Sequence, residues 1–285
     1  MHIPVLQKEV IQYLDPKPNE NFIDATIGGG GHSLEILQKI APRGRILGID
    51  WTQEAINGIK NKKNSSLILV CDNFANLTEI VKQNKISKIS GILLDLGMSS
   101  WHLEESGRGF SFLKREPLDM RYNTQNQLTA EKIVNFWSKF EIEKILREYG
   151  EERFAGEIAA RIVEERKVRP IQNTLQLAEI INRSVRGRSR IHPATQTFQA
   201  LRIAVNDELN NIEKVLPQAL QVLNPGGKLV VISFHSLEDR IVKNFFKNNI
   251  SNINLLTKKP VTPARQEIII NSRSRSAKLR AAAKI

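Results

Sequence analysis

The chain has 285 residues, of which 41% are hydrophobic, so it is long and apolar enough to form one large domain or two smaller ones. No apolar run reaches the roughly 18–20 residues of a membrane-spanning helix, and the first residues lack the features of a secretory signal. A single cysteine excludes an internal disulfide framework and a multi-cysteine zinc site. We therefore expect a cytoplasmic protein without a membrane segment.

The charge of the chain indicates its partners. Lysines and arginines number 42 against 30 acids, and the net charge of +12 favours nucleic acid, with a solvated basic surface as the alternative. Basic residues concentrate in two stretches, namely Arg183, Arg186, Arg188 and Arg190, and then Arg273, Arg275, Lys278, Arg280 and Lys284. We expect the first stretch to hold RNA phosphates, with helix capping or ion pairing as the alternative.

The first hundred residues alternate between strand and helix signals. Apolar runs typical of buried strands occupy residues 21–24, 45–50, 67–72 and 91–96, and helical stretches occupy 32–40, 53–62 and 76–83. This alternation predicts βαβ units around a buried parallel sheet, which is the α/β fold class.

The alternation stops between about residues 101 and 206, where apolar spacing predicts helices at 151–169, 175–185 and 195–223. It resumes with a strand at 228–234 and a helix at 237–248. We interpret the chain as one α/β domain, 1–104 and 208–285, which a helical insertion at 105–207 interrupts. The basic end, 272–285, is either a flexible tail or, over 279–285, a last edge strand.

A glycine cluster follows the first predicted strand. Asp24 ends that strand, and glycines occupy positions 28–31 before the first predicted helix. Glycines let the backbone turn sharply and approach a ligand, and a helix N-terminus offers free N–H groups to a carboxylate or phosphate. Asp50 ends the next strand, where its carboxylate can accept hydrogen bonds from both hydroxyls of a ribose.

Two ligands compete for this loop. A dinucleotide fingerprint requires a third glycine, but Ser33 holds that place. An acid four residues before the first glycine, here Asp24, is instead similar to the loop of S-adenosylmethionine-binding proteins. Asp24 or a loop carbonyl could accept a hydrogen bond from the ammonium of that cofactor. Residues 72–74, after the third strand, lie where an adenine would bind.

Asp95 ends the fourth predicted strand, directly after three aliphatic residues. In a doubly wound sheet this strand lies beside the glycine loop, and ligands bind at the carboxyl ends of such strands. Burying an acid without compensation is expensive, so we expect Asp95 to serve a ligand.

Motifs along the whole chain carry a resemblance to one family. In chain order they are HIPVL at 2–6, DAT at 24–26 with residues 28–33, LDLG at 94–97 with Ser99 and Ser100, RGFSF at 108–112, PLDMR at 117–121, HPAT at 192–195 with FQA at 198–200, ISFHSLEDR at 232–240 and SRSRS at 272–276. On these motifs the chain resembles the MraW family, the bacterial ribosomal RNA small subunit methyltransferases H.

The resemblance implies a Rossmann-like class I fold that uses S-adenosyl-L-methionine and carries an inserted helical substrate domain. It implies N4 methylation of a cytidine in the decoding region of 16S rRNA, within the assembled small ribosomal subunit, and it leaves a homodimer open. By motif position, the implied cofactor contacts are Gly30, Gly31, His32, Asp50, Phe74 and Asp95, with His102 standing where the family has a glutamine. The implied substrate-side residues are Ser99, Ser100, Arg108, Asp119, Arg121, His192 and His235.

The residues also discriminate among methylations. Making 5-methylcytosine needs an attacking thiolate, but the only thiol, Cys71, lies within the third predicted strand, where we expect it to pack in the core. N4 methylation needs chiefly positioning, together with an acceptor for a proton of the exocyclic amine. Asp95 is our candidate for this catalytic acceptor. A nearby carbonyl is the alternative, in which case Asp95 serves the cofactor.

Structural roles are the alternative for several other residues. Arg108, Asp119 and Arg121 could form loop-stabilising ion pairs, and His235 could be structural. Trp101, Phe110 and Phe112 could stack a splayed base, with a core role favoured for Phe112. The five histidines show no metal-ligand spacing, so we expect no catalytic metal. Two other classes stay open, a nucleic-acid-binding module with a vestigial pocket and a dinucleotide-dependent oxidoreductase.

Overall fold

The computed structural model describes residues 4–60, 65–185 and 192–285. The chain divides into two compact units, unit 1 (Met1–Gly97 with Leu209–Ile285) and unit 2 (Met98–Glu208). The sequence-based boundaries, after residues 104 and 207, differ slightly from these. None of the described helices is long and apolar enough to cross a membrane.

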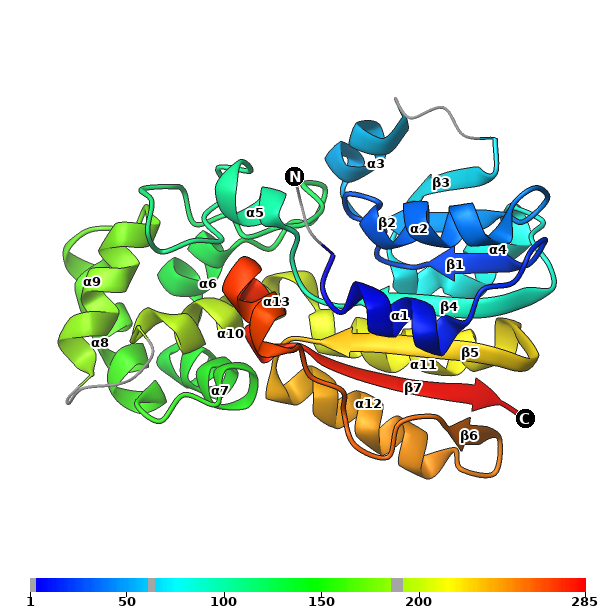
Figure 1. Ribbon diagram of the computed structural model, residues 1–285. Helices are drawn as coiled ribbons and strands as arrows, with labels where there is room; N and C mark the ends of the chain where they lie inside the picture. Colours follow the sequence, from blue (N-terminus) through cyan, green and yellow to red (C-terminus); the bar gives the residue numbers. More distant parts are fainter. Residues whose placement is uncertain (1–3, 61–64, 186–191) are drawn as a thin grey trace. The chain divides into compact units, whose positions relative to one another are not determined.

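Unit 1 is built around a seven-stranded sheet of order β3-β2-β1-β4-β5-β7-β6 (Figure 1). The strands are β1 (Asn21–Asp24), β2 (Ile46–Asp50), β3 (Leu67–Cys71), β4 (Ile89–Asp95), β5 (Leu223–Ser233), β6 (Ile253–Leu255) and β7 (Lys278–Lys284). The first five strands pair in parallel, whereas β7 runs antiparallel to both β5 and β6. The chain order reverses between β1 and β4, so the carboxyl ends of these two strands flank the switch point where ligands bind in such sheets.

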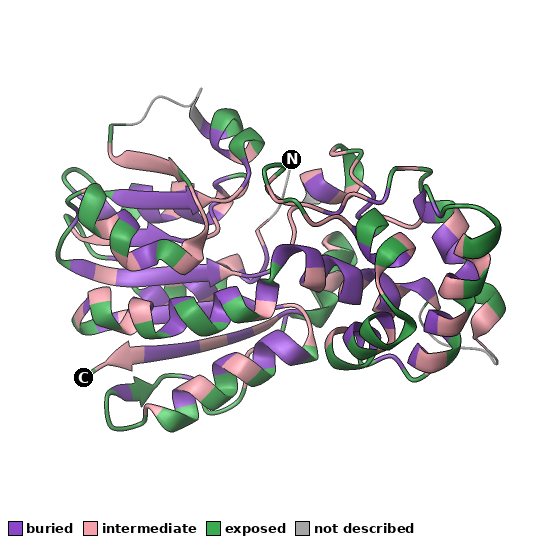
Figure 2. Cartoon of the chain, turned by 180° about the vertical axis from the view of Figure 1, so that it is seen from behind, coloured by how far each residue is buried: buried purple, intermediate pink, exposed green. Residues whose placement is uncertain are grey.

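Helices cover both faces of this sheet because successive residues of a strand point to opposite sides. Phe22 and Leu93 pack with α1 (Gln7–Leu14) and α2 (Gly31–Ile40). Their neighbours Ile23 and Leu94 pack on the other side, with α4 (Leu77–Gln83), α11 (Glu208–Val222) and α12 (Ser236–Asn248). The remaining helical segments of this unit are α3 (Gln53–Lys60), α13 (Arg265–Ile270) and the short turns η1 (Phe74–Asn76) and η2 (Ser272–Ser276). Figure 2 shows the resulting buried strands between helices whose outer faces are exposed.

Unit 2 contains only helices among its named elements. These are α5 (Ser100–Glu104), α6 (Ala130–Phe136), α7 (Lys139–Gly150), α8 (Ala155–Val168), α9 (Thr174–Ser184) and α10 (Ala194–Asn206). Their apolar stripes form one core that includes Ile142, Ile158 and Leu201. Capping boxes at Ser138 and Asn173 start α7 and α9 by satisfying backbone N–H groups that the first helical turn leaves free.

Three sequence-based expectations are wrong, wholly or in part. The helix expected over 195–223 is two helices, because Asp207 adopts a left-handed conformation (φ 52°) that ends α10. The basic end forms a strand, β7, as one of the two alternatives predicted, but it is not an edge strand, since β7 lies between β5 and β6. Cys71 is exposed at the end of β3 and does not pack in the core.

Candidate active site

The glycine loop joins β1 to α2 and takes its shape from two left-handed glycines. Gly28 (φ 48°) and Gly30 (φ 76°) occupy conformations that side chains disfavour. Gly31 is needed for packing, because a Cβ there would lie 2.3 Å from Pro4 Cγ. Gly29 is different: its φ is ordinary and a Cβ would meet nothing within 4 Å. No contact with the described residues therefore accounts for glycine at position 29, and the open space beside it is what a bound ligand requires.

Asp50 ties this loop to the end of β2. Its Oδ2 accepts a hydrogen bond from Gly28 N (3.0 Å), while Oδ1 accepts from Thr52 N (2.8 Å) and Thr52 Oγ1 (2.5 Å). Burial raises the pKa of Asp50, and these three donors oppose part of that effect. Because a carboxylate oxygen can accept two hydrogen bonds, Oδ2 retains the capacity to bind a ribose hydroxyl.

Asp24 lies beneath the loop rather than in it. Its side chain is only 2% exposed, Oδ2 accepts a hydrogen bond from Ser33 Oγ (2.6 Å), and Oδ1 accepts one from Thr26 N (3.3 Å). Burial raises the pKa of Asp24 to about 6. Ser33, which holds the third glycine position of a dinucleotide fingerprint, is thus occupied in anchoring Asp24. A contact of Asp24 with the cofactor ammonium stays a prediction.

Asp95 and His32 face one another at the carboxyl end of β4. His32 Nε2 lies 3.6 Å from Asp95 Oδ2, too long for a hydrogen bond but within ion-pair distance, and the His32 side chain is almost fully buried. Burial lowers the pKa of His32, but Asp95 and Asp24 outweigh burial and hold that pKa above its usual value. Thr26 Oγ1 accepts a hydrogen bond from Asp95 N (2.7 Å), which fixes the strand end.

Asp95 Oδ1 is buried and has no hydrogen-bond partner among the described residues. An unpaired buried carboxylate oxygen is expensive, so it indicates a donor that arrives with a ligand. Both ring nitrogens of His32 likewise lack a hydrogen bond within the described part of the chain. Unsatisfied polar atoms therefore cluster beside the N-terminus of α2.

The segment after β3 forms a self-contained turn. Asp72 Oδ1 accepts from Asn73 N (2.6 Å) and Asn76 Nδ2 (2.9 Å), and Asn73 Oδ1 caps η1 by accepting from Ala75 N (2.9 Å). Phe74 is half-buried and packs on the core of unit 1 with part of its ring accessible. The assignment of Phe74 to an adenine stays a prediction.

His235 follows β5 and belongs to a helix cap. Its Nε2 lies 3.1 Å from Glu238 Oε1, and the other oxygen of Glu238 accepts from Phe234 N (2.7 Å) and His235 N (3.2 Å). This arrangement starts α12 and gives His235 a structural partner. Its substrate role stays a prediction.

In unit 2, His102 sits in an aromatic cluster. Its ring lies edge-on to Trp101 (5.3 Å between centroids), Phe110 (5.1 Å) and Tyr122 (4.8 Å), and its Nδ1 is 2.9 Å from Ser99 Oγ. Burial, aided by nearby arginines, lowers the pKa of His102 to about 3. His102 is therefore neutral at physiological pH, and the cofactor contact carried over from the family stays a prediction.

Asp119 and Arg121 satisfy each other. Asp119 accepts from Arg121 Nε (2.7 Å) and Nη2 (2.8 Å), and Arg121 Nη1 also donates to the carbonyls of Thr124 and Asn126. Burial raises the pKa of Asp119, but the Arg121 guanidinium outweighs it and holds that pKa below its usual range. Arg108 donates to the Tyr122 carbonyl (3.1 Å) and covers the Trp101 ring (5.4 Å). These contacts match the loop-stabilising alternative.

The remaining candidates are dispersed over unit 2. His192 is exposed and stacks on Phe112 with 4.4 Å between ring centroids. Arg183 pairs with Glu179 on α9, while Arg186, Arg188 and Arg190 lie outside the described residues. Ser100 begins α5.

The sequence reasoning missed two threonines. Thr26 and Thr52 each stand two residues after an acid that ends a strand, and each bonds the backbone or side chain of a site carboxylate. The repeated Asp-x-Thr pattern is a local signal that would have found them, because hydroxyls bond readily to neighbouring groups at turns.

The sheet order, its single antiparallel insertion and the loops at the carboxyl ends define a class I methyltransferase fold. The chain matches a candidate rRNA methylase from Clostridium thermocellum over 100% of both chains with a TM-score of 0.51 and 12% identity, a likeness that concerns the fold alone. The whole chain, residues 1–285, matches the MraW methylase family, and it belongs to that family.

Two curated relatives extend this finding over the full length. Ribosomal RNA small subunit methyltransferase H of Heliobacterium modesticaldum is 46% identical over 308 residues, covering 100% of this chain and 98% of the relative. The protein of the same name from Halothermothrix orenii is 45% identical over 306 residues, again covering 100% and 98%. The family resemblance predicted from the sequence is thereby confirmed.

Proposed function

We propose that the protein transfers a methyl group from S-adenosyl-L-methionine to N4 of a cytidine in the decoding region of 16S rRNA. The names of the full-length relatives support small-subunit rRNA as the substrate. The observation that carries the proposal is the partnerless buried Oδ1 of Asp95 at the sheet edge that holds the glycine loop. A carboxylate oxygen at this place can accept a proton of an exocyclic amine.

The residues at this edge fit S-adenosyl-L-methionine. The space beside Gly29 and the first N–H groups of α2 suit its carboxylate. Asp50 Oδ2 has capacity for a ribose hydroxyl, and the accessible face of Phe74 suits an adenine. Gly30, Gly31 and His32 would lie against the amino-acid end. Bound there, the cofactor supplies an electrophilic methyl group.

The protein's contribution to the reaction is positioning and electrostatics. The cytidine N4 lone pair is delocalised into the ring, so a group that accepts an amine hydrogen bond favours the pyramidal nitrogen and the positive charge that develops on it. In our proposal Asp95 Oδ1 is that group, while His32 holds Oδ2 from the other side. As the N–CH₃ bond forms, N4 loses one proton towards the carboxylate or solvent.

Recognition of the RNA is assigned to unit 2 in this proposal. Ser99, Ser100, Arg108 and His192 are the residues that we propose to contact the substrate, and of these His192 is exposed. Asp119, Arg121 and His235 act by holding loops and caps rather than by touching the base. The assembled small ribosomal subunit is the substrate form that we propose.

The proposal is tested by mass spectrometry of 16S rRNA from a strain that lacks the protein. We expect one cytidine of the decoding region to lack its N4-methyl group in this strain. The wild-type gene should restore the methyl group, and the gene for the Asp95→Asn variant should not. Purified protein with labelled cofactor should then methylate subunits from the deficient strain and not subunits from the wild type. Unchanged N4 methylation in the deficient strain would refute the proposed target.

A further inference from the structure

The positive charge of the chain concentrates in its last segment. Residues 240–285 contain eleven lysines and arginines but a single acid, Glu267, so nearly all of the net charge of +12 resides there. Glu267 is itself occupied, because its Oε1 accepts a hydrogen bond from Leu6 N (2.8 Å). This segment lies wholly within the described part of unit 1.

Part of this charge is neutralised within the fold. Asp239 accepts from Arg280 Nε (2.7 Å) and lies 3.5 Å from Lys278 Nζ, and Lys284 Nζ donates to the Leu223 carbonyl (2.6 Å). The basic side chains of β7 are therefore committed to structure. They are unsuitable as an RNA-docking tail, although the sequence alone made that end attractive.

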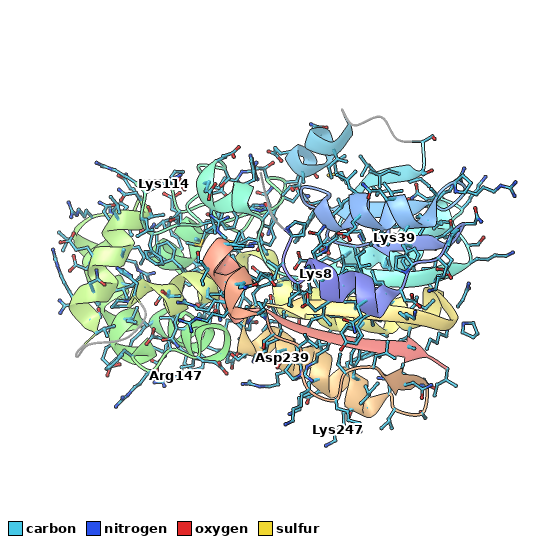
Figure 3. All side chains as sticks on the ribbon, viewed as in Figure 1. Lys8, Lys39, Lys114, Arg147, Asp239 and Lys247 are labelled. Carbon is cyan, nitrogen blue, oxygen red and sulfur yellow. The ribbon has the colours of Figure 1, made fainter. Side chains whose placement is uncertain are left out.

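Three of the exposed cations of this segment lie along α12, and the others, Lys258, Lys259, Arg265, Arg273 and Arg275, follow it in the chain. Arg240, Lys243 and Lys247 have the i, i+3, i+7 spacing that puts residues on one side of a helix, and all three are exposed. Val242 and Phe246, about a quarter turn or more away, pack against Ile253 of β6 and the sheet. The stripe therefore faces solvent, and Figure 3 shows Lys247 pointing away from the ribbon.

The two sides of α12 differ, because one carries the stripe and the other borders α11. Phe245, on the opposite flank, lines a surface cavity with Pro217 and Leu220 of α11. After β6 the chain returns along that outer edge, where Leu256 N donates to Ala281 O (3.0 Å) and Val261 exchanges hydrogen bonds with Leu279. Lys258 and Lys259 are exposed on this return segment, which passes α12 in Figure 1.

We infer that Lys243, Lys247, Lys258 and Lys259 form a docking surface for the phosphate backbone of RNA, hereafter the α12 surface. None of the four makes an ion pair or side-chain hydrogen bond to the residues that the structure describes. Lysines act on phosphates as point charges and carry no base information. The α12 surface thus supplies affinity for RNA flanking the target, and the inference rests on the proposed function insofar as that RNA is ribosomal.

RNA fits this surface better than a lipid bilayer does. A helix that lies in a membrane interface inserts a free apolar face, whereas Val242 and Phe246 of α12 are already buried against the sheet. Exposed Leu255 and Leu256 belong to the strand edge and the return segment, not to the helix. The side of α12 that faces solvent therefore carries the basic stripe, which suits the phosphate backbone of a polyanion.

The test compares two variants with the same loss of four positive charges. The first replaces Lys243, Lys247, Lys258 and Lys259 by Gln. The control replaces Lys39, Lys82, Lys85 and Lys88 by Gln; these are equally exposed and lie on α2 and around the connection from α4 to β4. Figure 3 labels Lys39 and Lys247 on different parts of unit 1. Binding of a 16S rRNA transcript is measured between low and moderate salt, together with the cofactor dissociation constant.

For the α12 variant we expect RNA affinity at low salt to fall by about tenfold or more. The slope of log affinity against log salt should become shallower by roughly 0.7 for each lysine that contacts a phosphate. Cofactor affinity should stay unchanged, and the control should keep the wild-type RNA affinity and slope. The inference is overturned if the two variants bind RNA equally. It is also overturned if the α12 variant loses only its binding to vesicles of phosphatidylglycerol and phosphatidylcholine.

The two proposals fail separately. If the wild-type protein methylates subunits while the α12 variant keeps its KM for them, the docking surface is wrong and the proposed function stands. If the wild type transfers no methyl group to rRNA, yet the α12 variant loses RNA affinity as expected, the proposed function is wrong and the docking surface stands.

Discussion

The ionisable groups at the sheet edge of unit 1 and the ion pairs of unit 2 differ in how their hydrogen bonds are satisfied. At the sheet edge of unit 1, Asp95 Oδ1 and both ring nitrogens of His32 are buried without hydrogen bonds to the described residues. Unit 2 instead pairs its charges: Arg202 forms a bidentate pair with Glu208 (both bonds 2.8 Å), and Arg121 does so with Asp119. Buried charges are normally paired in this second manner.

This difference separates a site from a scaffold. The fold of unit 1 leaves Asp95 Oδ1 unsatisfied at the edge to which parallel strands deliver their ends, where a ligand can complete its bonds. The paired groups of unit 2 hold the long loop between α5 and α6 and the end of α10. We therefore expect substitutions in unit 2 to reduce stability and substitutions at the edge of unit 1 to reduce cofactor binding or turnover.

The largest effect should come from Arg202→Met, which leaves the buried Glu208 carboxylate without its partner. Breaking a buried ion pair from one side costs about 3–5 kcal/mol. Urea unfolding should show this loss. The double variant with Glu208→Met should recover part of it, because both charges are then gone. A single variant as stable as the wild type would show that the pairing of unit 2 is not what stabilises it.

Asp95→Asn should affect turnover instead. The amide keeps the shape of the carboxylate but loses the charge that stabilises a cationic nitrogen, so we expect kcat to fall by about 10²-fold or more. Unfolding free energy and cofactor affinity should change little. Single-turnover methylation of deficient subunits at saturating cofactor measures the effect. A change confined to the KM for the cofactor would make Asp95 a cofactor ligand only.

Periodicity predicted the alternating half of the fold well, because each strand of β1 to β4 is a continuous apolar run. At β7 the sequence left a strand and a flexible tail open, because three consecutive alanines carry little strand signal; pairing with β5 and β6 decides that conformation. Periodicity also predicted one helix where the structure has α10 and α11. The break at Asp207 follows Asn206, whose Nδ2 donates to the Met120 carbonyl (2.7 Å) and whose Oδ1 accepts from Tyr122 N (2.8 Å).

The sequence predicted which residues lie at the candidate site, but not which of their side chains are buried or already hydrogen-bonded. Strand ends and a glycine loop sufficed to select Asp50 and Asp95. The sequence could not reveal that Asp24 is covered by Ser33, or that Asp119 is satisfied by the arginine two residues later, because both facts depend on the path of the surrounding loops.

The buried acid of unit 1 should give the protein a pH dependence. Burial raises the pKa of Asp24 to about 6 from an ordinary value of 3.8, so the folded state binds its proton more tightly than the unfolded state. Stability from this group is present below pH 4 and is lost as pH rises through about 6. In the Asp24→Asn variant the amide does not ionise, so this loss of stability with rising pH should disappear. The free energy of unfolding of the variant relative to the wild type should rise by about 2 kcal/mol between pH 4 and pH 7.

His102, a buried base of unit 2, should act in the other direction. Burial lowers the pKa of His102 to about 3 from an ordinary value of 6.5. Its stabilising contribution is therefore complete above pH 6.5 and declines as pH falls, by about 2 kcal/mol at pH 5. His102→Gln, which stays neutral, should flatten the stability profile between pH 7 and pH 5. A profile identical to the wild type would show that His102 is accessible to water in the native state.

The smallest effect, and the sharpest test of the comparison, is Asp50→Asn. Asp50 belongs to both categories, because Thr52 and Gly28 already bond it while Oδ2 retains capacity for a ligand. Loss of a charge-assisted hydrogen bond to ribose should weaken cofactor binding by about tenfold, with a modest loss of stability. Calorimetric titration with S-adenosyl-L-methionine measures the first effect and urea unfolding the second.

Thr52→Val is the matched control: it removes one bond to Asp50 Oδ1 but keeps the charge, so it should reduce stability and leave cofactor affinity nearly intact. If Asp50→Asn and Thr52→Val behave alike, Asp50 only holds the loop, and the free capacity of Oδ2 is not used by the cofactor.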